Sequence, residues 1–235
     1  MGKFKSILVL SDLHAPYGHP DTVPFLRALK KKYKPDKIVC IGDEIDGQSW
    51  SMHDHDPDLD SPGAELENAI KQLKPIYDLF PNAVVVDSNH GSLIFRRQRK
   101  YGIPEKAIKA YREVIDAPKG WTWVFDITLT MSNGEKVYFC HGKSGRPGAL
   151  SKSIGMSCVQ GHYHEKFEII YWANSNGLYW DARTSCLIDD SSRAFAYNNT
   201  NLHRPIIGTL VILNGHPKLE PMVLNKKGRW TGRLV

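Results

Sequence analysis

Three short apolar runs in the first half of the chain are each followed by side chains that can bind a metal ion. Asp12 and His14 lie two residues apart, and residues two apart in an extended chain point the same way. Carboxylate oxygen and imidazole nitrogen together suit Mn, Fe, Zn or Mg rather than a metal that prefers thiolates. The residues that follow the three runs are Asp12, His14, Asp43, Asn89 and His90.

The second half of the chain repeats this arrangement with histidines. His141 ends the apolar run 137–140, and His162 and His164 follow the run 157–160. His162 and His164 are again two apart, so both rings can point toward one place. A carboxylate can bridge two ions, and two ions about 3.5–4 Å apart can hold a phosphoryl group and the attacking hydroxide together. These residue types predict a metal centre with hydrolytic chemistry.

The first half of the chain alternates buried strands with helices. Such alternation is typical of a mostly parallel sheet, in which ligands gather at the carboxyl ends of the strands. We expect Pro75 to kink or end the second helix, because proline lacks the backbone N–H. The expected strands are 7–10, 37–41 and 83–86, and the expected helices are 22–32, 61–80 and 104–115.

The second half of the chain is rich in strands. Asn133-Gly134 predicts a hairpin turn, and we expect the tail from Asn225 to be poorly ordered or added at a sheet edge. The expected strands are 121–130, 136–141, 157–161, 167–172, 178–181 and 206–213. A parallel half followed by a strand-rich half predicts an α/β fold of two stacked mixed sheets with helices on the outer faces. We expect a single domain over residues 1–235.

Composition narrows the possible partners. The 235 residues are 41% hydrophobic and 24% charged, which favours a folded chain over a disordered one. The net charge of +6 favours phosphate-bearing partners, although a solvated basic surface has the same charge.

No apolar run reaches the length of a membrane span. The four cysteines form no C-x-x-C pair, so we expect no disulfide scaffold and a cytoplasmic location. The oligomeric state stays open.

Five segments together resemble the signature of calcineurin-like metallophosphoesterases. The segments are Asp12-Leu13-His14, Gly42-Asp43-Glu44-Ile45-Asp46, Asn89-His90, His141-Gly142 and Gly161-His162-Tyr163-His164. They span about two thirds of the chain, and as a set they are highly specific. The resemblance implies a four-layer αββα sandwich, which agrees with the pattern of strands and helices.

The resemblance also implies a role for each residue of these segments. It implies a metal-dependent phosphoesterase with two divalent ions, with Mn expected and Fe, Zn, Mg or Ni as alternatives. His90 would face the substrate and either protonate the leaving oxygen or steady the phosphoryl group. One ion would be held by Asp12, His14 and His164, the other by Asn89, His141 and His162, and Asp43 would bridge both.

The third segment departs from the family pattern. The family usually has Gly-Asn-His followed by Asp or Glu, whereas this chain has Ser88-Asn89-His90-Gly91. The usual acidic residue helps to orient the histidine. Asp87 or Asp46 could take over as the partner of His90, and the sequence leaves both open.

The substrate is inferred from a basic segment. Arg96 and Arg97 belong to a cationic run at 96–100, which is either a solvated helix face or a phosphate contact. We expect a phosphodiesterase that acts on DNA, RNA or nucleotides through in-line attack by metal-bound hydroxide. The alternatives are a phosphomonoesterase for a small molecule or phosphoprotein, and a non-catalytic binding scaffold. The histidine- and aspartate-rich segment 53–56 is either a solvated loop or an extra metal site.

Overall fold

The computed structural model describes residues 3–51, 58–192, 194–195 and 203–235. Within these residues the strands form two six-stranded sheets. The first sheet consists of β2 (Ser6–Leu10), β3 (Lys37–Cys40), β4 (Asn82–Val86), β5 (Gly120–Val124), β11 (Gly208–Leu213) and β12 (His216–Pro221), in the order β12-β11-β2-β3-β4-β5. The second consists of β1 (Lys3–Phe4), β6 (Ile127–Met131), β7 (Lys136–Cys140), β8 (Ser157–Gln160), β9 (Phe167–Asn174) and β10 (Gly177–Thr184), in the order β1-β6-β7-β8-β10-β9.

Both sheets are mixed, and each contains parallel strands where the candidate residues stand. β2, β3, β4 and β5 run parallel, and β11 and β12 complete that sheet as antiparallel neighbours. In the other sheet β7 is parallel to β8. The carboxyl ends of parallel neighbours meet at one edge of a sheet, so the loops that follow them lie side by side.

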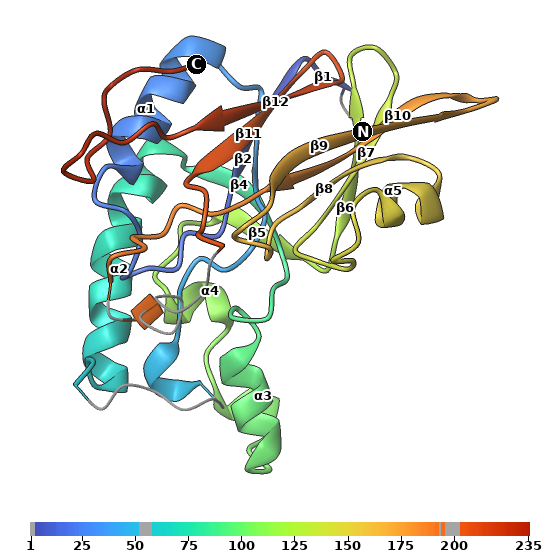
Figure 1. The fold of residues 1–235 in the computed structure, drawn as a ribbon. Helices are drawn as coiled ribbons and strands as arrows, with labels where there is room; N and C mark the ends of the chain where they lie inside the picture. Colours follow the sequence, from blue (N-terminus) through green and yellow to red (C-terminus); the bar gives the residue numbers. More distant parts are fainter. Residues whose placement is uncertain (1–2, 52–57, 193, 196–202) are drawn as a thin grey trace.

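Helices cover the outer faces of the two sheets (Figure 1). The α-helices are α1 (Thr22–Tyr33), α2 (Pro62–Leu79), α3 (Leu93–Lys100), α4 (Tyr111–Val114) and α5 (Ala149–Ile154). Short 3₁₀ turns lie at Gln48–Trp50 and Glu105–Ala107. Figure 1 shows α1 and α2 along one side of the stacked sheets, α5 on the opposite side, and α3 extending away from the sheets.

Side chains that alternate between the two faces of β2 pack into two different hydrophobic layers. Leu8 and Leu10 pack with the helix residues of α1 and α2, whereas Ile7 and Val9 pack against the other sheet. All four side chains are fully buried, as expected for a strand covered on both faces. Leu150 of α5 packs on the outer face of the second sheet. The predicted four-layer αββα sandwich is therefore confirmed.

Two of the predicted elements are wrong in detail. The predicted strand 121–130 is two strands, because β5 and β6 belong to different sheets. The predicted helix 104–115 reduces to one 3₁₀ turn and α4, since nearly all side chains from 101 to 110 are exposed and no apolar face drives a longer helix. Pro75 lies inside α2, which continues to Leu79 close to the predicted end at 80, so of the two alternatives for this proline the structure excludes an end of the helix.

The tail folds back onto the first helix. Arg229 Nε donates to Asp21 Oδ2 over 2.8 Å, and the Trp230 ring lies 5.5 Å from the Phe25 ring. Leu224 and Trp230 also form an isolated antiparallel bridge. Of the two alternatives expected for this segment, poor order is therefore wrong. Among the described residues, no helix combines the length and apolar character needed to cross a membrane.

The layer between the two sheets should supply much of the stability. Phe139 of β7 lies fully buried there, so Phe139→Ala should lower the free energy of unfolding by about 3–5 kcal/mol in urea titrations. The matched control is Phe125→Ala, because Phe125 is 73% exposed, and its effect should stay within about 0.5 kcal/mol. Equal effects of the two substitutions would contradict the assignment of this layer as core.

Candidate metal centre

Two buried aspartates stand at the ends of the central parallel strands. Asp12 follows β2 and Asp43 follows β3, and both are almost fully buried. Their backbones adopt left-handed conformations, with φ of 30° and 51°, which are uncommon for residues other than glycine. The His14 N–H donates to the Asp43 carbonyl over 2.8 Å, so the two loops are tied together. This backbone geometry turns both carboxylates toward one point.

Asp43 occupies the centre of the site. Its Oδ2 lies 3.0 Å from His141 Nε2 and 3.5 Å from His14 Nε2. Its Oδ1 accepts a hydrogen bond from the His90 N–H at 3.1 Å, and its own N–H donates to Ser88 Oγ at 2.9 Å. The Oδ2 atom therefore lies close to imidazole nitrogens of both His14 and His141.

One group of candidate ligands forms around His14. The His14 Nδ1 hydrogen-bonds the Asp46 carboxylate over 2.8 Å, which leaves its Nε2 for a metal. That Nε2 lies 3.2 Å from His164 Nε2. His14, Asp43 and His90 offer ligand atoms within 4.8 Å of one another. The structure thus places His90 beside this group, in addition to the predicted His164.

A second group forms around His141. Its Nδ1 hydrogen-bonds the Ile41 carbonyl over 2.9 Å, and its Nε2 lies 2.7 Å from Asn89 Oδ1. Asp43, His141 and His162 offer ligand atoms within 4.8 Å of one another. The two groups share Asp43, so the site is suited to a pair of ions with a common ligand.

Asp12 contributes a carboxylate oxygen that lacks a hydrogen bond. Its Oδ2 accepts a hydrogen bond from the His162 N–H over 2.9 Å. Its Oδ1 is buried, lies 3.4 Å from His141 Nδ1, and has no hydrogen-bond partner among the described residues. A buried carboxylate oxygen without a partner is costly, and a metal ion satisfies it.

The geometry fits divalent cations. His141 Nε2 faces oxygens of Asn89 and Asp43, and His14 Nε2 faces a second ring nitrogen, so lone pairs converge at both places. Lone pairs at these distances need a proton or a cation between them. Oxygen and imidazole ligands suit Mn, Fe, Zn or Mg. The residues brought together are all seven predicted ligands, namely Asp12, His14, Asp43, Asn89, His141, His162 and His164.

Burial and neighbouring charges shift the pKa values of these groups. Burial raises the pKa of the Asp12 carboxyl to about 8. Burial also acts to raise the pKa of Asp43, but the nearby His141 and His90 imidazoles outweigh it and hold that pKa well below its usual range. Burial lowers the pKa values of His162 and His164, and neighbouring imidazoles add to the effect. Both rings are therefore neutral near pH 7, as a metal ligand must be.

His90 contacts both Asp43 and Asp46. Its Nδ1 hydrogen-bonds the main-chain carbonyl of Asp46, which leaves Nε2 free to face a substrate. Burial acts to lower its pKa, but the carboxylates of Asp43 and Asp46 outweigh it, and the pKa is raised. Of the two acids that the sequence left open, Asp46 is the one that contacts His90, whereas Asp87 is exposed after β4.

The two predicted substrate-binding arginines differ in their contacts. Arg96 is exposed and donates from its NH2 group to the Asn89 carbonyl over 2.7 Å. Arg97 donates to the main-chain carbonyls of Trp50 and Ser51, and so anchors the segment that precedes the segment 53–56. That histidine- and aspartate-rich segment lies outside the described residues. Arg96 is therefore the one of the pair that reaches the loop carrying the metal ligands.

Ser88 belongs to the candidate site although the sequence predicts no role for it. Its Oγ accepts hydrogen bonds from the N–H groups of Asp43 and Gly91, over 2.9 and 3.0 Å. It thereby couples the loop after β4 to the central carboxylate. The signal was present in the sequence, because Ser88 stands where the family usually has glycine.

Comparison with known proteins gives a family match and several structural likenesses. The family model described as calcineurin-like phosphoesterase matches residues 5–216. Vacuolar Protein Sorting 29 from Cryptosporidium parvum is 13% identical, with a TM-score of 0.48, covering 100% of this chain and 96% of its own. The phosphoesterase Yfce from E. coli is 11% identical, with a TM-score of 0.46 and 98% coverage of both chains. The Pseudomonas putida nuclease MPE is 12% identical, with a TM-score of 0.35, covering 92% and 85%. No curated protein matches the sequence.

Removing the Asp46 carboxylate should weaken metal binding without removing a ligand. Asp46→Ala frees the His14 ring to rotate, and loss of such an orienting partner costs about 10–100-fold in metal affinity. The measurement is calorimetric titration of the metal-free protein with Mn. The control Asp87→Ala, which removes an exposed acid two residues before Asn89, should leave the affinity nearly unchanged. Equal losses in the two variants would show that general charge, not ring orientation, matters.

Metal affinity should rise with pH. Burial acts to lower the pKa of His141, but Asp43 and Asp12 outweigh it and raise that pKa to about 10 in the metal-free protein. Across neutral pH the ring therefore carries a proton that a metal must displace. The apparent affinity for Mn should increase about tenfold per pH unit for each proton released, up to the pKa. An affinity that stays constant from about pH 6 to about pH 8 would contradict this competition.

Proposed function

The chain belongs to the calcineurin-like phosphoesterase family, and from this membership and the paired ligand groups we propose that it hydrolyses phosphodiesters in nucleic acid or nucleotides. The observation that carries the proposal is the shared position of Asp43, which belongs to both groups of candidate ligands. A single carboxylate placed between two sets of imidazoles is what a two-ion phosphoesterase requires.

The candidate ligands would hold two divalent ions, for which we propose Mn. Such ions supply a nucleophile at neutral pH and neutralise charge on the phosphoryl oxygens. The chain would position them through Asp43, whose Oδ1 accepts a hydrogen bond from the His90 N–H and whose own N–H donates to Ser88 Oγ. Asp46 and the Ile41 carbonyl fix the tautomers of His14 and His141, so that Nε2 of each ring is available as a ligand.

His90 is the proposed proton donor to the leaving oxygen. The carboxylates of Asp43 and Asp46 raise its pKa and so favour the protonated ring, and its Nδ1 is already engaged by the Asp46 carbonyl. The remaining N–H at Nε2 can therefore donate to a substrate oxygen. A charged donor placed beside Asp43 can stabilise an oxyanion as it leaves.

The charge on α3 supports a polyanionic substrate. Arg96, Arg99 and Lys100 are exposed on this helix, which extends from the loop that carries Asn89 and His90 (Figure 1). Arginine forks match phosphate oxygens, and a row of cations beside a hydrolytic site suits a phosphate backbone.

We propose a cytoplasmic location on the ground that the four cysteines are all free and buried.

A hydrolysis panel with added Mn tests the proposal. The panel compares an aryl phosphodiester, an aryl phosphomonoester, and single- and double-stranded nucleic acid. We expect turnover of the diester and of nucleic acid, and Asp43→Ala should reduce both by more than about 100-fold, because both ion positions lose a ligand. Preference for the monoester would replace the proposal with phosphomonoesterase activity. Mn binding without turnover of any substrate would favour a binding scaffold.

The role of α3 is tested by salt dependence. Replacing Arg99 and Lys100 by alanine removes two exposed cations without touching a candidate ligand. For double-stranded DNA the slope of log affinity against log salt should become shallower by about 2, whereas turnover of the small aryl diester should change little. The matched control replaces the exposed Lys226 and Lys227 of the tail. An equal change in that control would mean that only net charge matters.

A further inference from the structure

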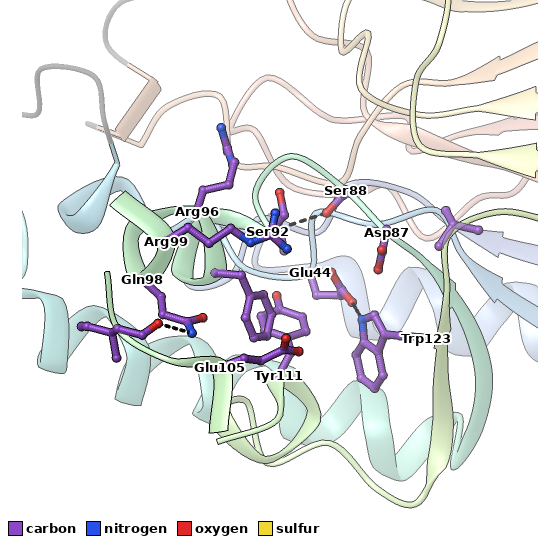
Figure 2. Close-up of a pocket in the computed structure, with 14 residues that line it drawn as sticks. Glu44, Asp87, Ser88, Ser92, Arg96, Gln98, Arg99, Glu105, Tyr111 and Trp123 are labelled. Carbon is purple, nitrogen blue, oxygen red and sulfur yellow. Dashed lines mark hydrogen bonds between the residues drawn. The ribbon is translucent and has the colours of Figure 1, made fainter. Parts of the chain in front are cut away.

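A cavity of about 480 Å³ lies beside the loop that carries Asn89 and His90. Ser88, Gly91 and Ser92 form one wall, so the cavity and the candidate metal centre share this loop. Figure 2 shows the other walls, which come from the loop after β3, from α3, from α4 and from β5. The volume falls within the range of about 300–1,000 Å³ that is typical of small-molecule sites.

A buried hydroxyl in this cavity has no partner. The Tyr111 side chain lines the cavity, is only 9% exposed, and its hydroxyl forms no hydrogen bond within the described residues. A buried hydroxyl normally pairs, because an unpaired one loses its hydrogen bonds to water without compensation. A ligand that supplies the missing partner would account for a tyrosine rather than a phenylalanine at this position.

Glu44 and Gly91 converge on the same space. Glu44 is 1% exposed, and its Oε1 accepts a hydrogen bond from the Trp123 indole over 2.9 Å (Figure 2). A Cβ atom built at Gly91 would lie 3.7 Å from Glu44 Oε2 and 3.7 Å from Tyr111 Cε1. Any longer side chain at position 91 would therefore enter the space between them. The glycine that replaces the usual acid keeps this part of the cavity open.

The rest of the lining is aromatic on the inside, and outside it carries both the cations of α3 and the exposed acids Asp87 and Glu105. The Tyr111 ring lies 5.7 Å from Trp123 and 6.3 Å from Phe95. Arg96 and Arg99 line the cavity as well, and both are exposed side chains of α3. A ligand that fits this lining has a flat apolar body, polar edges, and a negative charge at the end that faces Arg96 and Arg99.

We propose that the cavity binds a nucleobase of the substrate, and specifically a base with an exocyclic amino group. The inference rests on the proposed phosphodiesterase function for the origin of that base. The amino group would donate to the Glu44 carboxyl, a second edge atom would pair with the Tyr111 hydroxyl, and the phosphates would lie toward Arg96. Aromatic side chains bind bases by stacking or edge contacts, and a carboxylate selects an amino group over a carbonyl.

Nucleosides test this inference without hydrolysis, because they contain no phosphoester. Calorimetric titration of the Mn-loaded full chain compares two matched pairs, cytidine with uridine and adenosine with inosine. In each pair an amino group is exchanged for a carbonyl. We expect saturable binding in which the amino member of at least one pair binds about fivefold tighter or more. No saturable binding, or equal affinities within both pairs, would overturn the inference.

Two substitutions separate recognition from folding. Glu44→Gln keeps an oxygen for the Trp123 indole but adds an N–H donor, so the preference for the amino member should disappear or reverse. Tyr111→Phe should weaken nucleoside binding about threefold or more, while the melting temperature stays equal or rises, because the hydroxyl has no partner to lose. An unchanged base preference in Glu44→Gln would count against the assignment.

The outcome is distinguishable from the test of the proposed function. If Mn-dependent hydrolysis of the aryl diester is present but no nucleoside binds, the cavity is not a base site and the phosphodiesterase function stands. If nucleosides bind with the expected preference but no phosphoester is hydrolysed, the base site stands and the hydrolytic function is refuted.

Discussion

The candidate metal centre depends on holding the lone pairs of carboxylate, carboxamide and imidazole groups close together in the protein interior. Carboxylate, carboxamide and imidazole atoms approach to within 2.7–3.5 Å of one another around Asp43, and Asp12 Oδ1 adds a buried oxygen without a hydrogen bond. Such an arrangement is unfavourable unless positive charge lies within it. In the metal-free chain protons can supply that charge, as the raised pKa values of Asp12 and His141 indicate. Divalent cations can supply this positive charge more effectively than protons.

The layered fold makes this arrangement possible. β2, β3 and β4 are parallel and adjacent, so the loops after them lie at one edge of the first sheet. The loops after β7 and β8 of the other sheet carry His141, His162 and His164. The hydrophobic layer between the sheets fixes the distance between the two sets of loops. Left-handed backbone at Asp12 and Asp43 then directs the side chains inward. Backbone strain of this kind is common where a side chain must be held in place for function.

Much of this was predictable from the sequence, for identifiable reasons. Short apolar runs marked the buried strands, and polar residues directly after them marked the edge where ligands meet. The sequence could not show that the segment 121–130 leaves one sheet and enters the other, because both halves have the same strand character. It could not show that Asp46 contacts His90 through its carbonyl and His14 through its carboxylate, since that depends on a tertiary contact. The cavity beside Gly91 was also invisible, because its walls come from distant segments.

We propose that two cations share the Asp43 carboxylate. The most direct measurement is anomalous diffraction from crystals of the full chain grown with Mn. We expect two anomalous peaks about 3.5–4 Å apart, one toward His14 and one toward His141, with the Asp43 carboxylate between them. A single peak, or peaks that lie away from Asp43, would contradict it.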